Sequence, residues 1–327
     1  MHAYSELTPD TIFDAIEAQG YRCDGQYLAL NSYENRVFQF GIEDDQPIIA
    51  KFYRPNRWSE DQILEEHDFC LELADAEWPV VPPLKGQSGS TLHDHGKFKF
   101  ALFERKGGRT PELDDLDNLE ALGRQLGRLH AIGSQSSFDC RPQIDIESYG
   151  IQSREFLLSN DFIPDTLVAA YETLSQDLID TITLKFSDTP YGVLRLHGDC
   201  HAGNILWRED TPLFVDFDDC RSGPAIQDLW LLLSGDRDQQ RLQLETLLEG
   251  YEMFHDFDNR ELHLIESLRT LRIMNYAAWL ARRWSDPAFP MAFPWFNTER
   301  YWGEHIISLR EQLSELQELP LQRITAF

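Results

Sequence analysis

One short segment of the chain combines two carboxylates and an amide at a spacing suited to phosphoryl transfer. Asn204 follows Asp199 by five positions, and Asp216 comes soon after, at the end of an apolar stretch. Transfer of a γ-phosphoryl group needs a carboxylate that accepts the proton of the attacking hydroxyl, and hard oxygen ligands that hold Mg²⁺ against the phosphates. The pattern predicts Asp199 as the catalytic base, Asn204 and Asp216 as the metal ligands, and Asp216 as a second catalytic carboxylate.

Other interpretations of this segment have less support. His, Gly, Asp and Asn are common in tight turns, but the apolar flanks and the second aspartate favour a site over a structural turn. His197, Cys200 and His201 are zinc-binding residue types, but residues this close in a turn rarely converge on one tetrahedral ion, and no fourth ligand is evident. Cys200 would be a redox-sensitive thiol only if its pKa were depressed.

A phosphoryl-transfer site also needs a cation for the nucleotide phosphates and a group that holds this cation. Lys51 ends the strand-like run of residues 47–51, and Glu66 lies on the helix expected next along the chain. Glu65 is the rival partner for Lys51, one residue earlier; the helical spacing of the apolar residues favours Glu66 on the inward face. We therefore expect Lys51 to bind the α- and β-phosphates of ATP and Glu66 to hold Lys51.

The segment that would cover the phosphates is unusual. A glycine-rich loop is absent, and residues 31–38 stand in its place. Without glycines the backbone approaches a phosphate less freely, so the hydroxyl of Ser32, with nearby amide N–H groups, is predicted to contribute to phosphate binding. An ordinary polar turn that opens a hairpin is the alternative explanation.

The elements that would position these residues divide the chain into a strand-rich N-terminal part and a mainly helical remainder. The patterns predict an α+β protein of two lobes, with a small antiparallel-sheet N-lobe at 1–105 and a larger helical C-lobe at 106–327, and the nucleotide between them. In the helical part, Gly123 and Gly127 are expected to allow close helix packing. The expected elements are helices at 8–20, 59–74 and 261–284, strands at 37–40, 47–53, 97–104, 193–196 and 212–215, and an aromatic, proline-rich loop at 286–295. The strands at 37–40 and 47–53 are expected to form a hairpin through a turn at 43–46, and residues 59–62 form a capping-box sequence at the start of the helix at 59–74.

Composition narrows the class of protein. The 327 residues carry a net charge of −27, from 29 Lys and Arg against 56 Asp and Glu, which disfavours nucleic acid and membrane surfaces as partners. Five scattered cysteines form no C-x-x-C pair, so neither a disulfide framework nor a zinc cage is indicated. No leader or membrane-spanning stretch is recognisable, so the prediction is a cytoplasmic protein, expected to be a monomer.

Taken together, these motifs resemble the bacterial stress response kinase A family, within the wider aminoglycoside phosphotransferase and choline kinase group of the protein-kinase-like fold. The resemblance covers nearly the whole chain and rests on the segments at 31–40, 51–55, 62–67, 197–207, 215–219 and 228–230. It implies ATP and Mg²⁺ as cofactors, phosphorylation of protein Ser or Thr residues, autophosphorylation, and a role in the Cpx stress response that opposes stress-induced cell death. The resemblance implies that the catalytic base of that family corresponds to Asp199 in this chain, its metal ligands to Asn204 and Asp216, and the serine of its N-terminal loop to Ser32.

Two departures from the protein-kinase pattern matter. Gly198 replaces the arginine that would bind a phosphorylated activation loop, and Asp218 stands where that pattern has glycine. Regulation through activation-loop phosphorylation is therefore not expected. The acidic clusters at 112–117 and 218–219 are of a kind most often found on solvated faces, but as an acidic rim near the cleft they could steer a cationic substrate. Two rival functions stay open: a small-molecule kinase for an aminoglycoside, choline or homoserine-like alcohol, and a catalytically idle nucleotide-binding scaffold.

Overall fold

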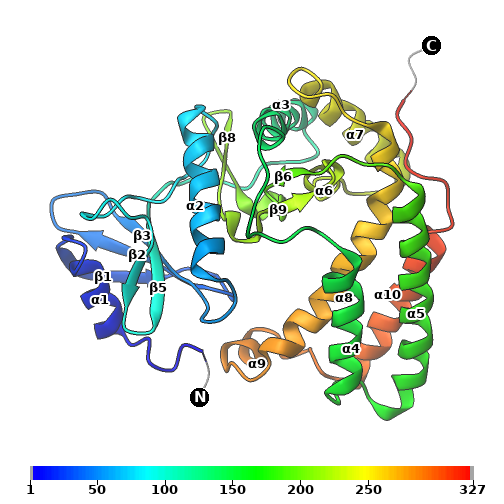
Figure 1. Ribbon diagram of the computed structural model, residues 1–327, viewed down its shortest axis with the longest axis horizontal. Coiled ribbons are helices and arrows are strands. Elements are labelled where there is room, and N and C mark those ends of the chain that lie inside the picture. Colours follow the sequence, from blue (N-terminus) through cyan, green and yellow to red (C-terminus); the bar gives the residue numbers. More distant parts are fainter. Residues whose placement is uncertain (1–2, 325–327) are drawn as a thin grey trace. The chain divides into compact units, whose positions relative to one another are not determined.

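The computed structural model describes residues 3–324, which form two compact units (Figure 1). The sheet unit comprises residues 3–112, 138–141 and 201–220, and the helical unit comprises residues 113–137, 142–200 and 221–324.

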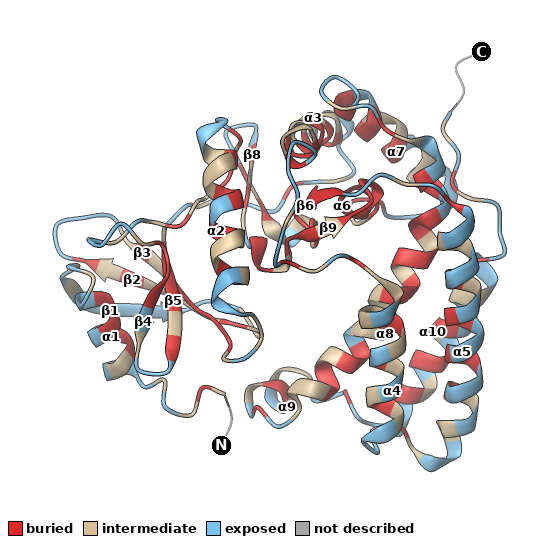
Figure 2. Cartoon of the chain, in the orientation of Figure 1, coloured by how far each residue is buried: buried red, intermediate tan, exposed pale blue. Residues whose placement is uncertain are grey.

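A five-stranded antiparallel sheet forms the centre of the sheet unit. Its strands run in the order β1, β2, β3, β5, β4, with bounds Cys23–Ala29, Arg36–Ile42, Ile48–Phe52, Phe98–Glu104 and His93–His95. The predicted hairpin is present as β2 and β3, paired from Arg36 opposite Phe52 to Phe40 opposite Ile48. Strands β1 and β4 were not predicted. β1 is exposed over most of its length, whereas the middle of β5 is buried (Figure 2), so β1 lacks the half-buried apolar alternation that identifies a strand.

The two faces of this sheet are covered by different helices. Helix α1 (Pro9–Glu17) packs Ile12 and Ile16 against a core that includes Phe40, Phe52 and Phe100. Helix α2 (Glu60–Asp75) supplies Ile63 to a smaller apolar cluster with Tyr53, Leu92 and Ala101. The predicted capping box is confirmed: the Gln62 N–H donates to Ser59 Oγ at 3.2 Å, and the Ser59 N–H donates to Gln62 Oε1 at 2.9 Å. This cap fixes the start of α2.

Two later segments of the chain pack with the sheet unit. The hairpin of β7 (Ile205–Arg208) and β8 (Thr211–Phe214) is attached where the Phe214 N–H donates to the Pro79 carbonyl at 2.8 Å. The rings of Trp78 and Phe214 lie 4.6 Å apart. The lobe boundary near residue 105 stays a prediction; in the structure, residues 138–141 and 201–220 from beyond that boundary belong to the sheet unit.

The helical unit contains longer helices and one small sheet. Its main elements are α3 (Leu116–Gly133), α4 (Gln152–Ser159), α5 (Asp165–Asp188), β6 (Leu194–Leu196), β9 (Arg221–Gly223), α6 (Ile226–Trp230), α7 (Arg237–Tyr251), α8 (Ile265–Arg283), α9 (Ala288–Ala292) and α10 (Glu299–Glu315). The predicted loop at 286–295 is wrong in part, because α9 forms within it and buries Phe289 at 5.1 Å from the Trp279 ring. Among the helices of residues 3–324, none has the length and apolar character needed to cross a bilayer.

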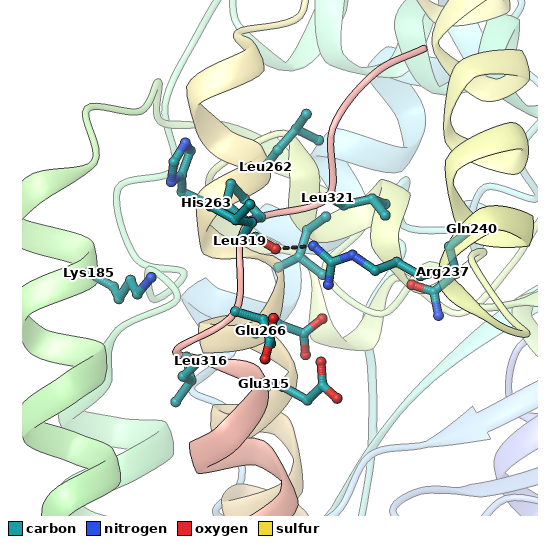
Figure 3. Close-up of a pocket in the computed structure, with 13 residues that line it drawn as sticks. Lys185, Arg237, Gln240, Leu262, His263, Glu266, Glu315, Leu316, Leu319 and Leu321 are labelled. Carbon is teal, nitrogen blue, oxygen red and sulfur yellow. Dashed lines mark hydrogen bonds between the residues drawn. The ribbon is translucent and has the colours of Figure 1, made fainter.

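The segment that follows α10 contacts α7. The Arg237 guanidinium donates to the Leu319 carbonyl there (Figure 3). Glu266, Glu315 and Leu321 line a small pocket beside this contact. None of the predicted site residues lines this pocket.

Helices α3 and α7 approach closely because glycines face the contact, as predicted. A Cβ built on Gly123 would lie 2.0 Å from the Leu247 carbonyl oxygen, and one on Gly127 would lie 2.3 Å from the Tyr251 carbonyl oxygen. Both distances are far inside van der Waals contact, and both neighbours are backbone atoms. The contact therefore tolerates no larger residue without a shift of one helix.

We expect Gly123→Ala to lower the free energy of unfolding by about 1–3 kcal/mol, because the new methyl group overpacks the contact between α3 and α7. The measurement is urea denaturation followed by circular dichroism. Gly303→Ala on α10 is the matched control, since a Cβ there meets nothing within 4 Å, and it should be neutral or stabilising by about 0.4–1 kcal/mol. Equal losses in the two variants would contradict the packing argument.

Candidate functional site

Lys51 is the centre of a buried group of charges in the sheet unit. Residues alternate across β3, so Lys51 faces away from the core that takes Ala50 and Phe52. Its Nζ lies 3.1 Å from Glu66 Oε1, 3.2 Å from Asp216 Oδ1 and 3.1 Å from Asp218 Oδ1. The structure thus brings together Lys51, Glu66 and Asp216, which the sequence placed in one site from positions far apart in the chain.

Burial makes these ion pairs strong and mutually dependent. The side chains of Lys51, Glu66 and Asp218 are 7%, 3% and 4% exposed, whereas that of Asp216 is 51% exposed. Burial opposes the charge of Lys51, but the carboxylates of Asp218 and Glu66 outweigh it and raise the pKa of Lys51 well above its usual value. The ammonium group therefore stays charged at neutral pH, and its partner Asp216 is half exposed.

The choice between Glu65 and Glu66 follows from the rotation of a helix. The inward residues of α2 recur as Ile63, Glu66, Phe69, Cys70 and Leu73, so Glu66 faces the sheet. Glu65, about 100° further round, turns to residues 138–141 instead. Its carboxylate accepts the backbone N–H groups of Asp139, Cys140 and Arg141 at 2.5, 2.9 and 2.6 Å.

Asn204 and Asp216 lie at the same end of the β7 and β8 hairpin. Asn204 directly precedes β7, and Asp216 is two positions after the end of β8. The Val215 N–H, between β8 and Asp216, donates to the Asn204 carbonyl at 3.0 Å. Asp216 has a left-handed backbone, with φ of 62°, which is costly for a residue with a side chain and typical of functional positions. An amide oxygen and a half-exposed carboxylate at one hairpin end fit a hard divalent cation.

Two arginines that the sequence analysis missed complete this group. Arg57 reaches Asp218 Oδ2 at 2.5 Å and Asp219 Oδ1 at 2.8 Å. Although burial acts against it, the Arg57 and Lys51 charges hold the pKa of Asp218 below its usual value. Arg141, with a fully buried side chain, donates to the carbonyls of Cys220 and Asp218 and lies 3.9 Å from Glu66. Arg141 thereby ties α2 to the segment that carries Asp216.

Ser32 takes no part in this arrangement. It lies between β1 and β2 with a half-buried side chain, and its N–H donates to the Leu30 carbonyl at 2.9 Å. Within residues 3–324, no hydrogen bond joins Ser32 to Lys51, Glu66 or Asp216. Its role toward phosphate stays a prediction.

Asp199 belongs to the helical unit and follows β6. The turn before it is shaped by Gly198, whose φ is 84°, and by the buried carboxylate of Asp228 on α6. Asp228 accepts the N–H groups of His197 and Gly198, both at 2.8 Å, and lies 3.2 Å from His130 Nε2. Because both carboxylate oxygens of Asp228 are used, the backbone that carries Asp199 is held from two directions.

Asp199 itself is partly exposed and has a cationic neighbour. Its side chain is 25% exposed, and its Oδ1 accepts from the Arg272 guanidinium of α8 at 2.6 Å. Cys200, the next residue, is fully buried, and burial raises the pKa of its thiol well above the usual value. The reactive thiolate form of Cys200 is therefore disfavoured.

Comparison with protein families identifies the class of the chain. Residues 27–265 match the model of the phosphotransferase enzyme family. The chain belongs to this family. It is accordingly a phosphotransferase, and the resemblance stated from its motifs is confirmed.

The most similar relatives include two from enteric bacteria. The chain is 50% identical over 319 residues to stress response kinase A of Escherichia coli (strain K12), covering 98% of this chain and 96% of the relative. It is also 50% identical to a protein named serine/threonine protein kinase RdoA from Salmonella typhimurium (strain LT2), again over 98% of this chain and 96% of the relative.

Solved structures agree on the fold. Amicoumacin kinase hAmiN, in complex with AMP-PNP, Ca²⁺ and Ami, superposes with a TM-score of 0.76 at 20% identity. The match covers 98% of this chain and 97% of the kinase chain. A microcompartment-associated aminopropanol kinase has a TM-score of 0.67 at 18% identity, and the match covers 91% of this chain and 95% of that kinase. The predicted protein-kinase-like fold is thus confirmed.

A further buried acid supports the turn that carries Asp199. Glu261 accepts the N–H groups of Gly192 at 3.2 Å and of Ile226, the first residue of α6, at 3.0 Å. Burial raises the pKa of Glu261 from 4.5 to about 7, although these N–H groups act in the opposite direction. Because α6 also carries Asp228, Glu261 fixes the element that shapes the Asp199 turn.

Lys51→Met is expected to lower the free energy of unfolding by about 3–5 kcal/mol, because it leaves the buried carboxylates of Glu66 and Asp218 without their shared cation. The measurement is urea denaturation with tryptophan fluorescence. Lys99→Met is the control: Lys99 is 31% exposed and pairs with Glu60 and Asp94 at 2.7 and 2.8 Å, so its loss should cost about 1 kcal/mol or less. Similar losses for both lysines would refute the buried-cluster interpretation.

The raised pKa of Glu261 gives a pH dependence of stability. The folded state binds the Glu261 proton more tightly than the unfolded state, and this difference adds to the free energy of unfolding. The added stability is complete below about pH 4.5 and is lost as pH rises through about 7. Glu261→Gln removes the titration. The free energy of unfolding of wild type minus that of Glu261→Gln should therefore fall between about pH 5 and about pH 7.5 in urea titrations. Parallel pH curves for the two proteins would rule this out.

Proposed function

We propose that the chain is an ATP- and Mg²⁺-dependent serine/threonine protein kinase of the bacterial stress response. The observation that carries the proposal is the set of distances around Lys51, because phosphoryl transfer needs a held cation beside a metal-binding carboxylate, and Lys51 contacts both Glu66 and Asp216. Family membership, and relatives at 50% identity that are named as stress response and serine/threonine protein kinases, support the same function.

The residues of the sheet unit would bind the triphosphate. Lys51 neutralises the α- and β-phosphates, and Glu66 with Asp218 holds its Nζ in place from the buried side. Asn204 and Asp216 supply an amide oxygen and a carboxylate for Mg²⁺. When bound, that ion offsets the charge that develops on the β- and γ-phosphate oxygens. The neighbour with AMP-PNP and Ca²⁺ supports a nucleotide with a divalent cation here.

Asp199 would act on the acceptor. Its carboxylate accepts the proton of a serine or threonine hydroxyl while that oxygen forms a bond to the γ-phosphorus, and the bond from phosphorus to the β,γ-bridging oxygen breaks to release ADP. The Asp228 contacts to His197 and Gly198 fix the backbone of this base, and the product is a phosphoserine or phosphothreonine. Ser32 is proposed to assist at the phosphates. Autophosphorylation and the Cpx link, which the family resemblance implies, stay predictions.

We expect Asp199→Asn to reduce turnover by about 10² or more, the scale of a lost proton acceptor, while leaving ATP binding nearly unchanged. Single-turnover transfer of ³²P to protein acceptors in a cell extract measures the first quantity, and titration with a fluorescent ATP analogue measures the second. Near-normal transfer by Asp199→Asn would exclude the assigned role. Full activity of Asp199→Ala in stressed cells would favour the idle scaffold instead, and label in small alcohols rather than proteins would favour a small-molecule kinase.

A further inference from the structure

Arg272 is the cation beside the proposed base. It lies on the partly exposed side of α8, a helix anchored by the buried residues Leu268, Leu271 and Met274. From there its guanidinium donates to Asp199 Oδ1 at 2.6 Å. A fixed helix and a short charge-assisted hydrogen bond hold the carboxylate in one orientation.

The Arg272 guanidinium has hydrogen-bond donors that Asp199 does not use. Arginine carries five N–H donors, and among the described residues Asp199 is the hydrogen-bonding and ion-pair partner of Arg272. Its side chain is 41% exposed. A ligand beside Asp199 would therefore lie near a guanidinium that has N–H donors left for it, which suits a carbonyl or carboxylate oxygen and repels an ammonium group.

We infer that Arg272 is a positioning and specificity residue that selects a neutral or acidic acceptor, a serine or threonine flanked by peptide carbonyls and carboxylates, and rejects amino alcohols. In choline, aminopropanol or an aminoglycoside, a cation lies within a few bonds of the reacting hydroxyl, so binding at Asp199 would bring that cation close to the guanidinium. The inference rests on the proposed function, since it takes Asp199 as the base. It also separates a protein kinase from the small-molecule rivals.

The test uses the full chain and three synthetic peptides that share one central serine and differ only at the two flanking positions: aspartate, alanine or lysine. For wild type we expect ³²P transfer to be fastest with the aspartate or alanine peptide. Arg272→Gln should reduce the ratio of kcat/KM for the aspartate peptide to that for the lysine peptide by about tenfold, the effect of about 1.4 kcal/mol. Arg272→Lys, which keeps the charge, should restore most of the ratio.

The matched control is Arg124→Gln. Arg124 is also 41% exposed and pairs with Glu120 at 2.9 Å on α3, so this variant changes the net charge equally and should leave the peptide ratio unchanged. Because both peptides are measured on the same variant, the ratio does not depend on the amount of folded protein. Comparison of that ratio with the wild-type ratio removes the effect of the acidic surface, which is common to both proteins. If a peptide is not labelled, each peptide's inhibition constant against Asp199-dependent ATP hydrolysis is measured instead. The ratio of these two constants then replaces the ratio of kcat/KM.

Failure of the inference and failure of the proposed function have different signatures. An unchanged peptide ratio in Arg272→Gln, with Asp199→Asn inactive, overturns the inference alone. Faster transfer by wild type to choline or 3-amino-1-propanol than to the alanine peptide also overturns it. Near-normal ³²P transfer by Asp199→Asn overturns the part of the proposed function that makes Asp199 the base, whatever the peptide ratio.

Discussion

The need to keep a lysine charged in a buried position organises the sheet unit. An ammonium group removed from water is stable only with carboxylates around it, and those carboxylates need cations in turn. Lys51 is satisfied by Glu66 and Asp218, and Asp218 by Arg57. The arrangement ties together β3, α2 and the segment after β8, which lie far apart in sequence. Asp216 is the member that remains half exposed and able to meet a ligand.

Local patterns predicted most of this framework. The capping box at Ser59, the apolar spacing of α2 and the hairpin of β2 and β3 are short-range features, and each formed as expected. The same spacing distinguished Glu66 from Glu65, because one residue of helix rotates a side chain by about 100°. The strands without an apolar alternation were missed, as was α9, where prolines suggested a loop but burial of Phe289 stabilises a helical turn.

The supporting charges could not be predicted. Arg141 and Arg57 lie in irregular segments with no periodicity, and their partners include the carbonyls of Cys220 and Asp218 and the side chain of Asp219, whose positions depend on the tertiary fold. Arg272 is one of several arginines on α8, and only the approach of Asp199 sets it apart. Residue type and spacing identified the groups proposed to do chemistry; the groups that hold them are visible only in three dimensions.

The sheet unit is discontinuous in sequence, which bears on how the protein is made. Residues 138–141, which cap the Glu65 carboxylate, and the hairpin at 201–220 leave the ribosome well after residue 112. Until that hairpin has been synthesised, Trp78 in the N-terminal part of the sheet unit lacks its contact with Phe214, and Lys51 lacks its partner Asp218. Such nascent chains expose apolar surface and unpaired charge for longer than a contiguous domain would. Chaperone dependence during translation is the expected consequence of this topology.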